Sequence, residues 1–150
     1  MYKFHLESLL NHRKFLEESI QRDLALAKRQ LGLEEGEMER LVRMEHQVAF
    51  DLKQKQQAMM NAHEFLLCQT FLERLSKEIN QQHQKVCEAQ FKVDATRNDL
   101  IEAVKKRETL EKLKESGLEA YTRKLLKNEQ DCLNETAVIQ FYHNQLENQK

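Results

Sequence analysis

The sequence carries apolar residues at every seventh position over long stretches, and it contains no proline in 150 residues. A heptad repeat of apolar residues buries one stripe of a helix against a partner helix, whereas proline in a helix interior would break it. The repeat is clearest in the second half of the chain, at Leu72, Ile79, Val86, Val93 and Leu100. A supporting row follows three residues later, at Leu75, Ala89 and Ala103. The pattern predicts a long helix paired with another through a coiled-coil seam.

The heptad row shifts by four residues after Leu100 and then resumes its period. It continues through Val104, Glu111, Leu118, Leu125, Cys132, Ile139 and Leu146. A four-residue insertion of this kind, a stutter, unwinds a coiled coil locally without ending the helix. The first half shows the same shift between Leu6 with Ile20 and a second row. The second row consists of Leu24, Leu31, Met38, Leu52 and Met59, supported by Leu41 and Val48. Both halves are therefore predicted to be helical.

The stretch "AMMNAHEF", from Ala58 to Phe65, separates the two repeats and has little charge. We expect the chain to reverse there, with helix one at about residues 4–58, a turn at about 59–64 and helix two at about 65–146. This reversal places Leu24 opposite Leu100 and brings the two stutters to one level. The predicted fold is all-α, a single-domain, long antiparallel two-helix coiled-coil hairpin.

In this register Leu6, near the start of helix one, lies beside Leu118. Helix two continues beyond this level with no part of helix one beside it. The chain keeps apolar residues in this part, including those of its last stretch, "NETAVIQFYHNQLENQK". We expect an overhanging C-terminal helix whose apolar side chains are covered by another protein. The candidate partner-binding residues are Leu125, Cys132, Val138, Ile139, Tyr142 and Leu146. Pairing of this helix with a second copy of the chain is the alternative that periodicity alone leaves open.

Charge and motifs narrow the function classes. The 24 Lys and Arg residues balance 25 Asp and Glu residues, which does not favour binding to nucleic acid. No stretch is apolar enough for a membrane span and no signal peptide is recognisable, so we expect a cytoplasmic protein with reduced cysteines. Phosphate loops, HExxH motifs and nucleophile triads are absent from the sequence, and His83 with Cys87 would supply only half a metal site. We expect no cofactor, metal, small-molecule substrate or enzymatic activity.

Three segments resemble the FliJ family of flagellar export proteins. The first is the start, "YKFHLESLLNHRKFLEESIQRDLALAKRQL"; the second is "FLERLSKEI" from Phe71 to Ile79; the third is "LEKLKESGLEAYTRKLLKNEQDCLNETAV" from Leu110 to Val138. Together they span most of the chain in the order and spacing of the family. The sequence departs from the family at Asn134, where an acidic residue is usual.

The resemblance implies a hairpin akin to the central stalk of rotary ATPases. Its paired termini would enter the hexameric export ATPase, and Phe71 and Leu75, near the tip, would contact the cytoplasmic domain of the export gate. It also implies escort of export chaperones, a peripheral position at the inner membrane and a largely monomeric free state. Leu75 also fits the seam, whereas Phe71 is expected to be exposed. A self-associating structural coiled coil and a prefoldin-type chaperone hairpin are the alternatives, although "AMMNAHEF" leaves no room for the β-strands of prefoldin.

Overall fold

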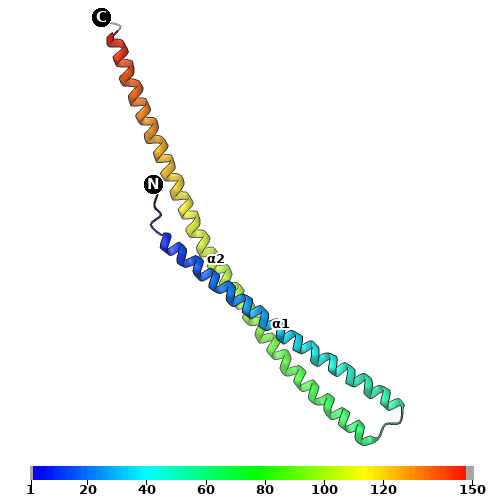
Figure 1. Ribbon diagram of the computed structural model, residues 1–150. Helices are drawn as coiled ribbons and strands as arrows, with labels where there is room; N and C mark the ends of the chain where they lie inside the picture. The colour runs from blue at the N-terminus through cyan, green and yellow to red at the C-terminus, as the bar shows by residue number, and fades with distance from the viewer. Residues whose placement is uncertain (1, 148–150) are drawn as a thin grey trace. The chain divides into compact units, whose positions relative to one another are not determined.

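A computed structural model describes the backbone of residues 2–147 and the side chains of residues 2–141 and 143. Helix α1 spans Glu7–Gln57 and helix α2 spans Ala62–Glu147 (Figure 1). No strand occurs among the described residues. The two helices follow one another through a short connection and pack against each other, so the predicted all-α, antiparallel two-helix hairpin is confirmed.

The connection at residues 58–61 reverses the chain without glycine or proline. Met59 adopts the left-handed conformation, with φ at 60°. Asn61 then begins the second helix: its side-chain Oδ1 accepts from the backbone N–H of His63 at 3.4 Å, and its carbonyl accepts from Phe65 N–H at 3.1 Å. An asparagine before the first helical residue satisfies N–H groups that have no partner within the helix. Helix α2 therefore begins at Ala62, three residues earlier than predicted.

Met59 shows where the heptad extrapolation was wrong. The repeat assigned this residue to the seam, but its side chain is 97% exposed. A residue at positive φ turns the backbone away from the helical path. The seam of α1 therefore ends at Leu52, which is half-buried.

Residues Leu16–Ala103 form one compact unit, which we call the tip unit. Its core contains Leu24, Ala27 and Val93, against which Leu31 and Leu100 pack. Leu24 with Leu100, and Leu31 with Val93, are pairs that the predicted register placed opposite each other. Between this core and the turn, Leu41 and Leu75 are also buried.

One polar side chain lies within the apolar seam of the tip unit. Gln82, seven residues after Leu75 in the same row, is only 5% exposed. Its Nε2 donates to the Glu34 carboxylate at 2.7 Å and to the Glu34 backbone carbonyl at 3.0 Å. Both contacts join α1 to α2. They give the buried Nε2 donor of Gln82 the acceptors that it would otherwise lack. The heptad pattern does not predict this pair.

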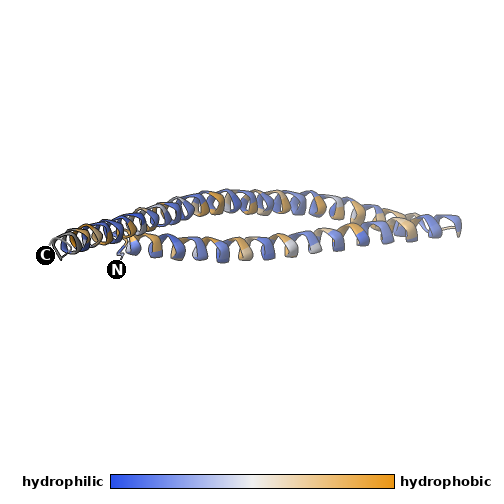
Figure 2. Cartoon of the chain, turned by 90° about the horizontal axis from the view of Figure 1, so that it is seen from above, coloured by the Kyte–Doolittle hydropathy of each residue, from blue (hydrophilic) through white to orange (hydrophobic). Residues whose placement is uncertain are grey.

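The residues up to Phe15, together with those from Val104 onward, form the second unit, which we call the end unit. Leu10 is its buried apolar residue, at 2% exposure. Beyond Tyr121, α2 continues with no buried or half-buried side chain from Thr122 to Phe141. This is the predicted overhanging C-terminal helix. Hydrophilic and hydrophobic residues alternate along both helices (Figure 2), and neither helix, over its described residues, is long and apolar enough to cross a membrane.

Candidate partner-binding surfaces

The first candidate surface is residues 122–140 of α2, which we call the unpaired segment because α1 does not lie beside it. Four of the predicted partner-binding residues lie on it and are exposed: Leu125, Cys132, Val138 and Ile139. Leu125 is 43% and Ile139 67% exposed. The predicted residues Tyr142 and Leu146 lie outside the residues whose side chains are described. A helix with large exposed apolar side chains and no packing partner is typical of a protein-binding surface.

The unpaired segment contains further exposed apolar residues that the sequence analysis did not select. They are Leu126 and Leu133, and Phe141, which follows the segment, is also exposed. The strict heptad row passes through Leu125 and Cys132, whereas Leu126 and Leu133 each follow a member of that row and lie beside it on the helix. Their spacing of seven was the signal that could have found them. The apolar surface is therefore wider than a two-stranded seam requires.

Charge is also distributed unevenly along the unpaired segment. Basic residues come first, at Arg123, Lys124 and Lys127, and acidic residues follow, at Glu129, Asp131 and Glu135. Arg123 is paired with Glu119 one turn earlier, at 3.6 Å. A partner that covers this surface must therefore accommodate both signs of charge, in a fixed order along the helix.

The second candidate surface lies beside the turn, in the tip unit. Phe71 is 42% exposed and borders a shallow pocket of about 320 Å³. The other lining residues are Val48, Asp51, Leu52, Lys55, Leu67 and Cys68. Leu66 and Leu67, in the first turns of α2, are more than half exposed and add apolar area that the sequence analysis missed.

Leu75 differs from Phe71, although the resemblance grouped the two. Its side chain is 2% exposed because it occupies the seam between α1 and α2. A buried residue contributes to a partner surface only by holding its neighbours in place. Phe71 is therefore the member of the predicted pair that a partner can contact in this conformation, and Leu75 is a packing residue.

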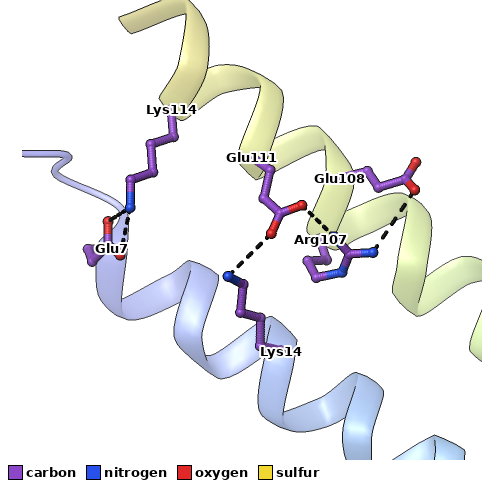
Figure 3. A network of polar contacts seen from close by, with 6 residues as sticks. All are labelled: Glu7, Lys14, Arg107, Glu108, Glu111 and Lys114. Atoms are coloured by element: carbon purple, nitrogen blue, oxygen red, sulfur yellow. Dashed lines mark hydrogen bonds and ion pairs between the residues drawn. The ribbon is translucent and has the colours of Figure 1, made fainter. Parts of the chain in front are cut away.

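Polar contacts link the two helices in the end unit (Figure 3). Lys114 Nζ lies 2.7 and 2.9 Å from the two carboxylate oxygens of Glu7. Lys14 Nζ lies 3.3 Å from Glu111, which Arg107 also contacts. The hydrogen bond from Lys14, with the nearby positive charge of Arg107, lowers the pKa of Glu111 below its ordinary value. Glu111 occupies a seam position in the heptad row, and these two cations explain how a carboxylate is accommodated there.

His83 and Cys87 lie one turn apart on α2, with Nδ1 and Sγ separated by 3.7 Å. Cys87 is a free thiol and both side chains are exposed. Across the described residues, no group of three or more His, Cys, Asp or Glu side chains is arranged to hold a metal ion.

Comparison with known proteins identifies the family. The solved structure of a protein described as a YscO homologue from Chlamydia trachomatis is similar in fold, with a TM-score of 0.56 and 19% sequence identity over 100% of this chain and 99% of that one. No curated protein matches the sequence. The family described as "Flagellar FliJ protein" matches residues 2–146. The family match covers nearly the whole hairpin, and we conclude that the chain belongs to the FliJ family, whose members are components of flagellar type III export.

Proposed function

We propose that this protein is the stalk-like component of the export apparatus and that its unpaired segment enters the ring of the hexameric export ATPase. The observation that carries the proposal is the exposure of every residue from Thr122 to Phe141 within one continuous helix. A single helix with side chains is about 10–12 Å across, and 20 residues extend about 30 Å. These dimensions suit a narrow, deep binding site such as a ring pore.

The role is mechanical or organisational rather than catalytic. Supporting this, the candidate surfaces consist of apolar and charged side chains on helix exteriors, which suit protein contacts. In this proposal Phe71 contacts the cytoplasmic domain of the export gate, and the protein also meets export chaperones. It would act in the cytoplasm, held peripherally at the inner membrane through its partners.

Truncation after Tyr121 tests the proposal directly. This cut removes the unpaired segment but keeps Tyr121, whose ring contacts Tyr2 at a centroid distance of 5.8 Å. The shortened hairpin should keep a cooperative thermal unfolding transition by circular dichroism, because its seam is intact. Its co-sedimentation with the ATPase hexamer should be lost. Phe91→Ala is the matched control, since it removes a 76% exposed apolar side chain from the tip unit and should leave ATPase binding unchanged.

Two results would contradict the proposal. Retained ATPase binding by the truncated chain would place the interface elsewhere. A concentration-dependent dimer of the intact chain in sedimentation velocity, abolished by the truncation, would instead favour the self-associating coiled coil. We expect a largely monomeric protein.

A further inference from the structure

The N-terminal segment, residues 2–6, lies against α2 immediately before the unpaired segment begins. Residues of this segment and of α2 together line a pocket of about 520 Å³. The α2 side of the pocket consists of Leu113, Gly117 and Tyr121. Tyr2 is half-buried there, and its ring is tilted by 43° against that of Tyr121. The N-terminal segment thus covers a part of α2 that would otherwise continue the exposed apolar surface.

Gly117 provides the space that Tyr2 occupies. A Cβ atom at this position would lie 2.2 Å from the Tyr2 hydroxyl oxygen, which is too close for the ring to remain in place. Glycine lowers helix stability relative to alanine, so its presence in the interior of α2 carries a local disadvantage. The other helical glycines, Gly32 and Gly36, have no such neighbour within 4 Å. The close approach of Tyr2 therefore accounts for Gly117 in a way that helix formation alone does not.

The contacts beside this segment that link α1 to α2 are weak enough to break readily. The adjacent ion pairs, Glu7 with Lys114 and Lys14 with Glu111, involve side chains that are 38% to 48% exposed. Ion pairs at this exposure contribute little to stability and are screened by salt. Among the described residues of the end unit, Leu10 alone is a buried apolar residue. The segment can therefore leave α2 while the tip unit stays folded.

We propose that residues 2–6 form a displaceable strap, and that the partner of the unpaired segment takes over the surface at Leu113, Gly117 and Tyr121. Tyr121 and Leu125 are four residues apart, so they lie one above the other on the same helix face. A partner that covers Leu125 therefore meets the Tyr2 ring, which packs at a tilt against Tyr121. This inference rests on the proposed function for the identity of the partner, the export ATPase ring.

Hydrogen–deuterium exchange of the N-terminal peptide tests whether the effects of Tyr2 and Gly117 are coupled. Gly117→Ala should speed exchange at the amides of Glu7 and Leu10, which bond to Phe4 and Leu6 in this structure. We expect an increase of about threefold or more, the effect of losing one aromatic contact. Tyr2→Ala should do the same, and adding Gly117→Ala to it should have no further effect. Gly36→Ala, the matched control, should leave this peptide unchanged. Additive effects of the two changes would overturn the strap.

Binding to the ATPase ring supplies the second test, on the full-length chain. Ring binding to the wild-type protein should speed exchange in residues 2–10, because the strap is displaced; slower exchange would mean that the ring covers the strap, which overturns the proposal. Tyr2→Ala and Gly117→Ala should bind about threefold or more tightly, since a larger fraction of the molecules is ready to bind. Equal or weaker binding would also overturn it.

The two proposals can fail separately. If the wild-type ring complex forms and the variants bind no tighter, the strap proposal is wrong and the proposed function is supported. If no variant binds the ring, the proposed function is wrong, and the ring is not the partner that displaces the strap. The exchange coupling between Tyr2 and Gly117 then decides whether the strap itself exists.

Discussion

The tip unit and the end unit use different chemistry to join the same two helices. In the tip unit, Leu24, Ala27 and Val93 form an apolar core, and one buried amide contact links Gln82 to Glu34. In the end unit, the contacts between the helices include partly exposed ion pairs and a tyrosine pair, and Leu10 is the buried apolar residue among those described. Apolar burial is strong and hardly depends on salt, whereas exposed ion pairs are weak and salt-sensitive. The contrast indicates a firmly paired tip unit and an end unit whose pairing is easily changed.

The strongest test of tip-unit pairing is a cross-link between Leu24→Cys and Leu100→Cys, in a background without Cys68, Cys87 and Cys132. Both side chains contact the same core, so we expect an intramolecular disulfide and a monomer on a non-reducing gel. Closing a loop of this length should stabilise the fold by about 4 kcal/mol in the chain-entropy model. The single variants are the controls. Covalent dimers from both single variants, without the intramolecular product, would rule out the hairpin.

Truncating apolar side chains should separate buried from exposed positions. Leu75→Ala should lower the free energy of unfolding by about 2–4 kcal/mol in urea titrations, because it leaves a cavity in the seam. Phe71→Ala should cost under about 1 kcal/mol and should weaken gate binding, while Leu133→Ala in the unpaired segment should change stability by no more than about 0.5 kcal/mol. A large loss at Leu133 would mean that this segment is packed in the free protein.

Replacing Gln82 with leucine tests whether the buried amide fixes the helix register or only stabilises the fold. A leucine of similar volume removes a buried polar contact, and Glu34, which is half-buried, can turn to water. We expect stability to rise by about 1 kcal/mol. The defined register should weaken, since a single polar seam residue fixes the alignment of two helices. The measurement is the yield of the Leu24–Leu100 cross-link in this background; an undiminished yield together with lower stability would assign Gln82 a purely stabilising role.

The smallest expected effect is the pH dependence of the end unit. The pKa of Glu111 is lowered in the folded protein, chiefly by the hydrogen bond from Lys14, so its contribution is present above the ordinary value of 4.5. This contribution is lost as pH falls below that value through the folded-state pKa. Exchange at the start of α1 should therefore differ between wild type and Glu111→Gln at pH 6 and converge at low pH.

Glu37→Gln is the matched control for that measurement. The pKa of Glu37 is also lowered, chiefly by its hydrogen bond with Arg40, but this pair lies within α1 of the tip unit. The substitution should leave exchange at the start of α1 unchanged at every pH. Equal effects of the two substitutions would mean that the pH dependence does not come from the contacts between helices in the end unit.

The sequence by itself determined the helical hairpin, the seam of the tip unit and the unpaired segment. A heptad row defines a helix face from local spacing alone, and the row in the second half simply outlasts its counterpart in the first. For that reason the spacing of Leu125, Cys132, Val138 and Ile139 was enough to select them as surface residues. The pairs Leu24 with Leu100 and Leu31 with Val93 followed in the same way from the reversal near Asn61.

Only the tertiary structure decided which polar side chains meet across the helices. Gln82 finds Glu34 across 48 residues, and Lys114 finds Glu7 across 107. Such contacts depend on the register to within a fraction of a helical turn, which spacing along one helix does not contain. The same holds for the position of the Tyr2 ring over Gly117. Each depends on what the opposite segment places there, and that is a property of the folded pair rather than of either stretch of sequence.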